Sequence, residues 1–540
     1  MLNIKEYTPK LFTLLKDGIG KEQVFKDISS GVIVGIVALP LAIAFAIASG
    51  VSPEKGLVTA VVAGFLISAL GGSKVQIGGP TGAFIVIVYG IVQQYGYNGL
   101  VISTFLAGFI IILLGLARLG NLLKFIPHSL IVGFTSGIAI IIFTSQIKDF
   151  LGLQTGALPA EFLGKWEAFF RNIQTVNFYA VGVAIVTILV TLYTKKITTR
   201  VPGPFLAILV GTLAVQIFQL PVETISSKFG QISGAIPAPK LPKVDFETIR
   251  HLIEPAFAIA LLGAIESLLS AAVADGMIGG RHRSNMELVA QGIANIASAL
   301  FGGIPATGAI ARTATNVKNG GRTPIAGITH AVTLLLIMLV FAPYAKLIPL
   351  SCLAGILIVV AYNMGEWHSF ASVLRSNRYD ALILLTTFIL TIFFDLVIAI
   401  EIGVVLSSFV FMKRMSDIAQ FNLLEDPQAQ PLLDENLTIP PGVLIYEINS
   451  PLFFGVAQRF QETLSEINVK PKKIIIRMRS VPFIDATGIY RLKEIIHSYE
   501  NRNIDVVISE PGREVLRSIL SNGVIPRSKI AVDIDTALGK

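Results

Sequence analysis

The stretch "GGPTGAFIV", residues 78–86, occurs a second time in altered form as "PATGAIARTATNV", residues 305–317. Each copy has a proline, then Thr-Gly-Ala, then apolar residues. The similarity extends upstream, because residues 68–70 and 298–300 both read Ser-Ala-Leu and a Gly-Gly pair follows each. We call these two stretches the first and second phrase. The repeat indicates that the two halves of the chain share one architecture.

The composition is that of a membrane protein. The chain has 540 residues, 53% hydrophobic and 14% charged, with a mean hydropathy of +0.71. Soluble domains carry about a quarter charged residues, so we expect a polytopic α-helical protein with the lipid bilayer as its partner. We attribute the net charge of +8 to Lys and Arg in the cytoplasmic loops rather than to a nucleic-acid partner. The single cysteine, Cys352, excludes an intramolecular disulfide.

Fourteen apolar runs lie between residues 28 and 413. They are expected at 28–48, 54–71, 80–94, 99–116, 126–147, 176–195, 204–220, 255–275, 286–301, 307–318, 324–343, 350–365, 379–394 and 396–413. A membrane helix needs about 20 residues, so 80–94 and 307–318 are too short to cross alone. These two runs carry the phrases.

The basic residues predict the orientation. If the N-terminal segment, residues 1–27, is cytoplasmic, every second loop carries Lys or Arg, as cytoplasmic loops do. These loops contain Lys74, Arg118, Lys124, Lys195, Lys196, Arg200, Arg281, Arg283, Lys318, Arg322, Arg375, Arg378, Lys413 and Arg414. We therefore expect both termini in the cytoplasm and the transmembrane domain, residues 28–413, in a cell inner membrane or plasma membrane.

Seven spans in each half would place the halves in opposite orientations, an inverted repeat. Gly and Pro break a helix in the middle of the membrane. Such irregular backbone is tolerated where it is buried in protein or lines a water-filled cavity. Thr81 and Thr307 could then act as N-caps of short helices. The free N–H groups and positive dipole ends of these helices would face one another across an anion site. The alternative is that the glycines only allow close helix packing.

Two charged residues lie within apolar runs. Arg312 follows the second phrase by about one turn, and helical side chains lean towards the N-terminus, so it could reach the site; otherwise it snorkels to the boundary. Glu266 lies in mid-run, where a charge costs ~3 kcal/mol, and could exchange protons as substrate binds. The alternatives for Glu266 are a fixed salt bridge with Arg312 or a hydrogen-bonded neutral acid. Ser270, one turn on, could add an oxygen ligand.

The tail is predicted to be a separate cytoplasmic domain. Residues 414–441 are rich in Pro and acidic side chains and read as a linker. From 442 to 540 strands and helices alternate, which predicts a small α/β domain, with Asp485 as N-cap of a helix. The chain shows no nucleophile–base constellation, nucleotide-binding loop or metal-binding cluster. We therefore expect no enzyme activity, no cofactor and no metal.

The sequence resembles the sulfate permease (SulP) family along nearly its whole length. The resemblance is carried by the phrases and by "ALPLAIAFAIASG" at 38–50, "GAIESLLSAAVADG" at 263–276 and "DLVIAIEIGVVL" at 395–406. The tail looks like a STAS domain, whose Asp-x-Ser/Thr-Gly turn matches residues 485–488. In STAS domains regulated by phosphorylation a Ser or Thr stands where Thr487 does, so Thr487 is a candidate regulatory residue.

The resemblance implies a seven-plus-seven inverted repeat of core and gate domains, an elevator-type motion and a homodimer. It places the substrate, a dicarboxylate, sulfate or bicarbonate, between the two short helices. The implied substrate-binding residues are Phe45, Thr81, Gly82, Ala83, Phe84, Thr307, Gly308, Ala309, Ile310 and Arg312. By this resemblance, a Glu at position 266, with Ser270 beside it, favours H⁺ rather than Na⁺ as the coupling ion.

Four functions compete at this point. The first is proton-coupled uptake of a small inorganic or organic oxyanion, and the second is sodium-coupled or uncoupled exchange. The third is a membrane-tethered signalling protein whose output is the STAS domain. The fourth is a nucleobase permease of the same architecture, to which a cationic Arg312 would be poorly matched.

Overall fold

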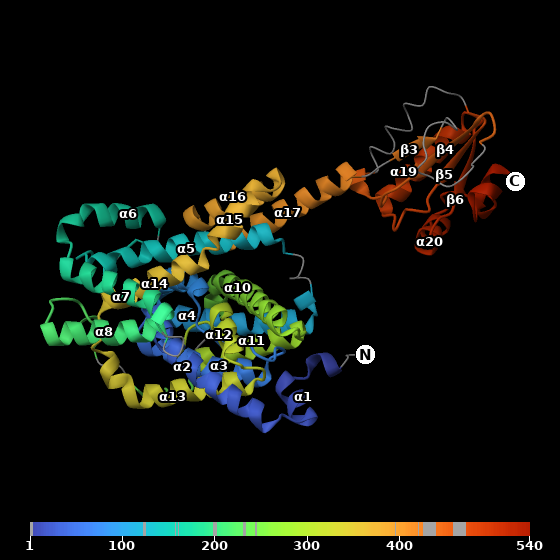
Figure 1. The fold of residues 1–540 in the computed structure, drawn as a ribbon. Coiled ribbons are helices and arrows are strands. Elements are labelled where there is room, and N and C mark those ends of the chain that lie inside the picture. The colour runs from blue at the N-terminus through green and yellow to red at the C-terminus, as the bar shows by residue number, and fades with distance from the viewer. Residues whose placement is uncertain are drawn as a thin grey trace. The chain divides into compact units, whose positions relative to one another are not determined.

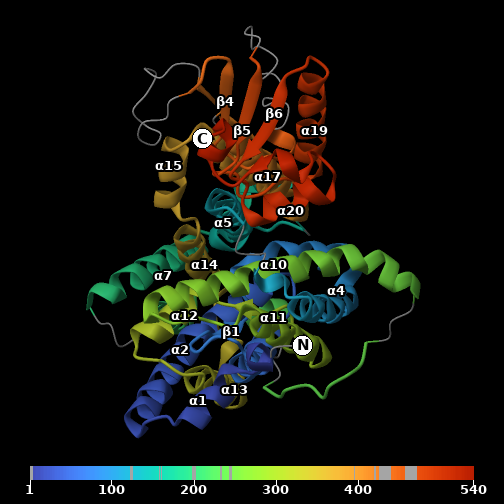
Figure 2. The ribbon, with the colours of Figure 1, turned by 90° about the vertical axis from the view of Figure 1, so that its right-hand side faces the viewer.

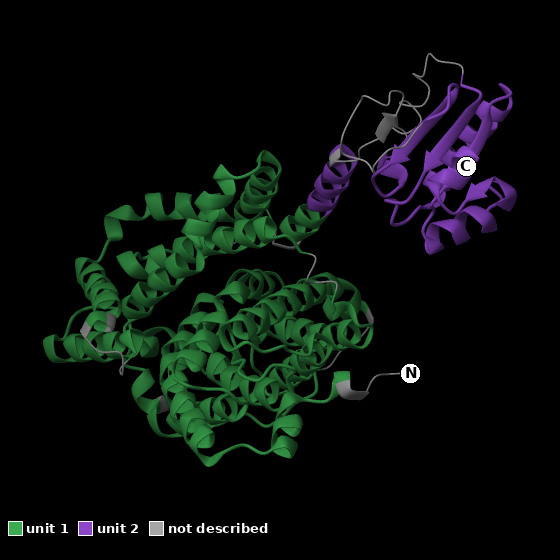
Figure 3. Ribbon diagram, turned by 45° about the vertical axis from the view of Figure 1, so that its right-hand side comes forward, with its two compact units in different colours: residues 1–404 green, residues 405–540 purple. Residues whose placement is uncertain are grey.

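A computed structural model describes residues 4–121, 126–156, 158–159, 161–197, 202–230, 234–242, 246–394, 396–418, 421–424, 439–456 and 471–540. The chain divides into two compact units, residues 1–404 and 405–540 (Figure 3). The described part of the first unit is helical apart from two short paired strands, and the second unit contains a five-stranded sheet. This organisation matches the predicted helical membrane region and α/β tail.

Among the described residues, six helical segments are long and apolar enough to cross a membrane. They are α2 (Lys21–Ala48), α3 (Pro53–Leu70), α4 (Ile85–Leu116) with the turn η2 (Gly82–Phe84), α5 (His128–Leu151), α10 (Phe246–Ile278), and α14 (Leu350–Met364) with α15 (Trp367–Arg375). Shorter apolar segments lie in α7 (Phe178–Ile197), α8 (Gly203–Phe218) and α13 (Ile325–Ala345). The count of fourteen spans stays a prediction.

The helices of the first unit pack into two bundles. The core bundle contains α2, α3, α4, α10, α11 (Ser284–Leu300), α12 (Ile310–Lys318) and α13, and the gate bundle contains α5, α7, α8, α14 and α16 (Arg378–Phe393). Figure 1 shows α5 and α16 side by side, and α10, α11 and α12 grouped together. Both halves of the sequence contribute to both bundles, as an internal repeat requires.

The amphipathic helix α6 (Phe162–Arg171) follows α5, and α15 follows α14 at the corresponding place in the second half. The order of elements is therefore similar in the two halves. The remaining short helices of the first unit are α1 (Lys10–Asp17) and α9 (Ile225–Phe229), and α17 (Leu396–Ile418) runs from the first unit into the second.

Glycines bring the core helices into backbone contact. A Cβ on Gly108 of α4 would lie 2.7 Å from the carbonyl oxygen of Gly292 on α11, and a Cβ on Gly292 would collide with the carbonyl of Gly108. On α2, a Cβ on Gly31 would collide with the carbonyl of Ala326 on α13. Such close approach is what small residues allow between membrane helices. It fixes the helices that hold the two phrases.

The first short helix is joined to the next span. Separate helices are predicted at 80–94 and 99–116, and α4, Ile85–Leu116, is indeed two helices joined at a kink, where Gly96 is non-helical with φ 68° and ψ −178°. Glycine adopts a positive φ without the steric cost that a Cβ brings, so the chain redirects without a loop. In the second half, α12 and α13 are separate helices.

The sheet of the second unit has the order β3 (Phe421–Leu424), β4 (Val443–Ile448), β5 (Lys473–Arg477), β6 (Asp505–Ser509) and β7 (Ile530–Ala531). β3 is antiparallel to β4, and the other neighbours are parallel. Among the described residues that follow α17, the α-helices are α19 (Ala486–Glu500), α20 (Arg513–Ser521) and α21 (Ile534–Leu538), and Figure 2 labels α19 and α20.

One part of the predicted linker, 414–441, is wrong, because residues 421–424 form β3, paired along its length with β4. An edge strand is stabilised by hydrogen bonds to its neighbouring strand. The surrounding residues are rich in Pro and acidic side chains, so the composition of the segment did not indicate a strand. Residues 419–420 and 425–438 of that linker, and residues 457–470 of the predicted α/β domain, lie outside the described residues.

Candidate functional site

The two phrases pair with each other through their backbones. β1 (Gly78–Gly79) and β2 (Thr307–Gly308) are antiparallel, with Gly78 opposite Gly308 and Gly79 opposite Thr307. In Figure 2, β1 is seen among the helices of the core bundle. Two related stretches that run antiparallel are what an inverted repeat produces, although Gly78–Gly79 pairs with the residues that align with Thr81 and Gly82. The two copies of the repeat detected in the sequence therefore lie in contact in the structure.

A helix begins just after each strand. η2 starts at Gly82 and leads into α4, and α12 starts at Ile310. The first N–H groups of a helix have no acceptor within it, and they carry the positive end of the helix dipole. Two electropositive helix starts thus lie beyond opposite ends of the paired strands. That they face one another across an anion site stays a prediction.

The threonines of the phrases differ from the prediction. Thr81 occupies the N-cap position of η2, but its side chain makes no capping bond, and its buried Oγ1 has no hydrogen-bond partner among the described residues. Thr307 lies within β2, so Ala309 is the N-cap of α12, and Thr307 Oγ1 instead donates to the Gly263 carbonyl at 2.9 Å. The predicted N-cap position is therefore confirmed for Thr81, without a side-chain capping bond, and is wrong for Thr307. The hydroxyl of Thr81 is left available to a ligand.

Arg312 lies in the first turn of α12 and is 3% exposed. Its Nη2 donates to the carbonyl of Pro80, and a Cβ on Gly79 would lie 2.7 Å from its Nη1. The guanidinium therefore lies against the backbone of the first phrase and does not snorkel. Among the described residues, no carboxylate pairs with it. A guanidinium has five N–H donors and no acceptor, so one carbonyl leaves most of its donors and its charge unmatched.

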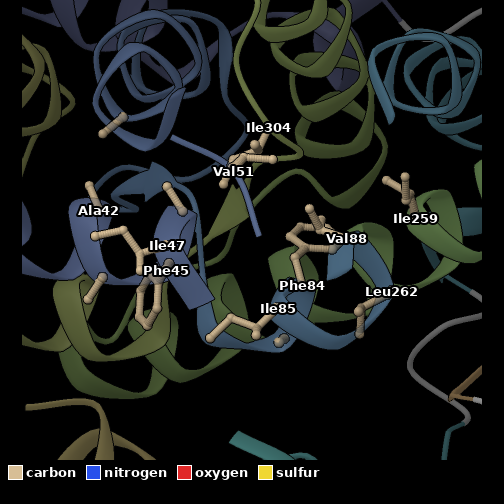
Figure 4. Close-up of a cluster of buried hydrophobic side chains, with 14 of the residues drawn as sticks. Ala42, Phe45, Ile47, Val51, Phe84, Ile85, Val88, Ile259, Leu262 and Ile304 are labelled. Atoms are coloured by element: carbon tan, nitrogen blue, oxygen red, sulfur yellow. The ribbon is translucent and has the colours of Figure 1, made fainter. Parts of the chain in front are cut away.

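Apolar side chains of both bundles surround the start of η2. A Cβ on Gly82 would lie 3.2 Å from Ile142 Cδ1 of α5, 3.6 Å from Met364 Sδ of α14 and 3.6 Å from Phe45 Cε1 of α2. Figure 4 shows Phe45 and Phe84 in the buried cluster to which α2 and the start of α4 contribute. The first phrase therefore faces the junction between core and gate, with the predicted Phe45 beside it.

The remaining predicted residues divide by exposure. Ala83 and Ala309 are buried, whereas Ile310 is 37% exposed. The N–H of Ala309 donates to the carbonyl of Ile77 at 2.8 Å, which extends the strand pairing. The exposed side chain of Ile310 means that the first turn of α12 is accessible, although Arg312 in the same turn is buried.

Glu266 of α10 is 7% exposed and forms no hydrogen bond or ion pair with a described residue. The alternative of a fixed salt bridge with Arg312 is therefore not found. Ser270 Oγ lies 3.3 Å from Thr313 Oγ1 and so links α10 to α12.

Two polar residues that hold the phrases were missed. Gln76 is buried, its Nε2 donates to the Ser267 carbonyl at 3.1 Å, and its Oε1 has no partner among the described residues. A Cβ on Gly308 would collide with the Gln76 amide. Thr313 Oγ1 accepts from the N–H of Ile77 at 3.0 Å. The available signal was a lone amide in "VQIGG", directly before the first phrase.

In the second unit, Asp485 is the N-cap of α19, as predicted. Its Oδ1 accepts from the N–H of Gly488 at 2.7 Å and its Oδ2 from the N–H of Phe454 at 3.0 Å. Thr487 is exposed in the first turn of that helix. Across the described residues of both units, no group of three His, Cys, Asp or Glu side chains could hold a metal ion.

Comparison with known proteins identifies both parts of the chain. Residues 24–387 match the model of the sulfate permease family, and residues 436–537 match that of the STAS domain. The chain is 44% identical over 493 residues to a putative sulfate transporter, YvdB, of Bacillus subtilis, covering 91% of this chain and 92% of that one. It is 30% identical over 455 residues to the bicarbonate transporter BicA of Picosynechococcus, covering 80% and 79%.

Solved structures give the same fold. The murine anion transporter Slc26a9 in its inward-facing state superposes with a TM-score of 0.88 at 19% identity, covering 99% of this chain and 94% of that one. The transmembrane domain of a cyanobacterial bicarbonate transporter, BicA, superposes with a TM-score of 0.64 at 31% identity, covering 72% and 98%.

Proposed function

The chain belongs to the sulfate permease family, whose members are transporters and not enzymes, and on that premise we propose secondary active transport of a small oxyanion coupled to protons. The anion binds between the starts of η2 and α12, where the two phrases pair. Its ligands are the N–H groups of these helix starts, the hydroxyl of Thr81 and the guanidinium of Arg312.

One observation carries this proposal: the buried guanidinium of Arg312 has a single carbonyl acceptor and no ion pair among the described residues. A buried charge is costly unless it is paired, and an anion supplies the partner. The neighbouring groups are donors as well, since the Thr81 hydroxyl is unpartnered and the helix starts present N–H groups. A neutral nucleobase would leave the charge unmatched, which disfavours the permease alternative.

The substrate class follows from the donors and from the names of relatives. Arginine binds planar or tetrahedral oxyanions through two parallel N–H···O bonds. The relatives are named as sulfate and bicarbonate transporters, and these two anions are the first candidates. A C4-dicarboxylate is the third, because its carboxylate offers the same pair of oxygens.

We assign proton coupling to Glu266. This carboxyl is buried in the core bundle and has no hydrogen bond or ion pair with a described residue. A desolvated carboxylate is costly and protonation removes its charge, so uptake of a proton favours the arrangement in which Glu266 is buried. Sodium coupling and uncoupled exchange are the alternatives, since a cation at Glu266 would have the same electrostatic effect.

Transport then requires the core bundle to move against the gate bundle. Ile142 and Met364 of the gate bundle lie next to Gly82 of the core bundle and are apolar, so the two bundles can slide here without breaking hydrogen bonds. The motion is of the elevator type, with the substrate carried by the core, and the transporter is a homodimer. Rigid movement suits a core whose helices touch through glycines.

The test is a radiotracer panel in proteoliposomes with sulfate, bicarbonate and a C4-dicarboxylate under imposed H⁺ or Na⁺ gradients. The proposal expects one of these anions to accumulate under an inward proton gradient. Accumulation under sodium alone would overturn the coupling. Sealed liposomes without flux of any anion would favour the signalling alternative, for which the exposed Thr487 at the start of α19 is the supporting observation.

A further inference from the structure

A cavity of about 410 Å³ lies at the end of the first unit where α2 and α5 finish. Ile47 of α2, Ser145 of α5 and Ile85 at the start of α4 contribute to its wall, and α6 and α9 close it. Ile85 and Val86 are the last residues of the first phrase, whereas the paired residues Gly78–Gly79 and Thr307–Gly308 do not line the cavity. By the predicted orientation this is the extracellular end.

Lys165 of α6 lines this cavity and is 5% exposed. Its Nζ lies 5.0 Å from the centroid of the Tyr89 ring, and among the described residues it has neither an ion pair nor a side-chain hydrogen bond. Burial lowers the pKa of Lys165, because the charged ammonium is desolvated. A ring face only partly replaces the water that a buried ammonium loses. An anion in the cavity would supply the missing acceptor.

The other charged groups on the wall leave the cavity positive. Lys148 donates to the carbonyl of Thr155 at 3.1 Å and has no ion pair with a carboxylate of the described residues. Lys228 lies 3.9 Å from Asp149, and these two charges balance. Glu161 is the second carboxylate on the wall, and this residue is exposed. Three ammonium groups therefore face two carboxylates, and the most buried of the five is an unpaired cation.

We infer that this cavity is a second anion site, in which Lys165 binds the transported oxyanion before it reaches the paired phrases. This inference rests on the proposed function, because the ligand is the same anion. A capture site raises the local concentration of substrate at one face of the membrane. It lowers the KM for anion arriving from that face and leaves the central site, with Arg312, to carry it across.

Kinetics measured separately from each face test the inference. Uptake into proteoliposomes of defined orientation is measured for wild type, Lys165→Gln, Lys165→Arg and the control Lys346→Gln, which removes a lysine outside the cavity wall. Loss of one charge-assisted hydrogen bond predicts that Lys165→Gln raises KM about ten-fold from the extracellular face. Its Vmax, and its KM from the cytoplasmic face, should stay within about two-fold. Lys165→Arg should restore most of the affinity, because it retains the charge.

Several outcomes would overturn the second site. An unchanged extracellular KM in Lys165→Gln does so, and so does an equal rise from both faces. Loss of Vmax and thermal stability in both Lys165 variants, with KM unchanged, assigns Lys165 to packing on Tyr89. Absence of uptake by wild type would instead refute the proposed function, so the two failures are distinguishable.

Discussion

Arg312, in the second half of the chain, donates a hydrogen bond to the backbone carbonyl of Pro80 in the first half. The bond runs alongside the pairing of Gly79 with Thr307. The cation of the candidate site is therefore positioned by the phrase opposite to its own. Neither half could build this site alone, which explains why the chain carries the phrase twice.

Replacing Arg312 by Ala should weaken anion binding about 100-fold, because a buried charge-assisted pair is lost. The anion affinity of Arg312→Lys should lie between those of wild type and Arg312→Ala, since lysine keeps the charge but not the bidentate geometry. Calorimetry on the purified protein measures both affinities. The control is Arg375→Ala at the exposed end of α15. Binding by Arg312→Ala within about two-fold of wild type would remove Arg312 from the site.

The two threonines should respond differently. Thr81→Val removes an unpartnered hydroxyl, so it should reduce anion affinity by about five-fold at unchanged stability. Thr307→Val leaves the Gly263 carbonyl without its donor, so it should lower stability by ~1 kcal/mol. Thermal unfolding and calorimetry on the same preparations separate the two effects. Equal loss of affinity and stability in both variants would contradict the distinction drawn between them.

A side chain at Gly308 should disrupt the junction, because a Cβ there collides with the Gln76 amide. Gly308→Ala is expected to cost ~1–3 kcal/mol, as overpacking does, and to abolish uptake. Shortening the neighbour in Gly308→Ala/Gln76→Ala should restore stability in part. Gly276→Ala is the control, since nothing lies within 4 Å of that position. If Gly308→Ala transports normally, the strand pairing is not required.

Glu266→Gln should transport anion without coupling to protons, because the amide cannot gain or lose a proton. Accumulation under a proton gradient should disappear, whereas exchange of anion for anion should persist and lose its dependence on pH. Glu254→Gln, an exposed carboxylate on the same helix, serves as the control. Proton-driven accumulation that survives in Glu266→Gln would show that the proton is carried elsewhere.

Much of the fold follows from the sequence because its signals are local. The apolar runs, the breaks at the phrases and the N-cap at Asp485 depend on residues near one another in the chain. The proximity of the two phrases could be inferred from the repeat, because similar stretches more than 200 residues apart indicate two halves with equivalent positions. Arg312 was placed near the junction by its spacing from the second phrase, whereas Phe45 was placed there only by the resemblance to the sulfate permease family.

What the sequence concealed depends on contacts between distant residues. The Thr307 hydroxyl prefers the Gly263 carbonyl of α10 to its own helix start, and the Gln76 amide fills space that Gly308 leaves open. The absence of an ion pair between Glu266 and Arg312 depends on how α10 packs against α12. No spacing within the chain determines these distances.

The most direct measurement is an experimental structure with selenate, or with the anion that the tracer panel identifies, located by anomalous scattering or by difference density. The account predicts an anion within hydrogen-bonding distance of the Arg312 guanidinium and the Thr81 hydroxyl, between the starts of η2 and α12. An anion bound elsewhere in the core bundle, with this junction empty at saturating concentration, would contradict it.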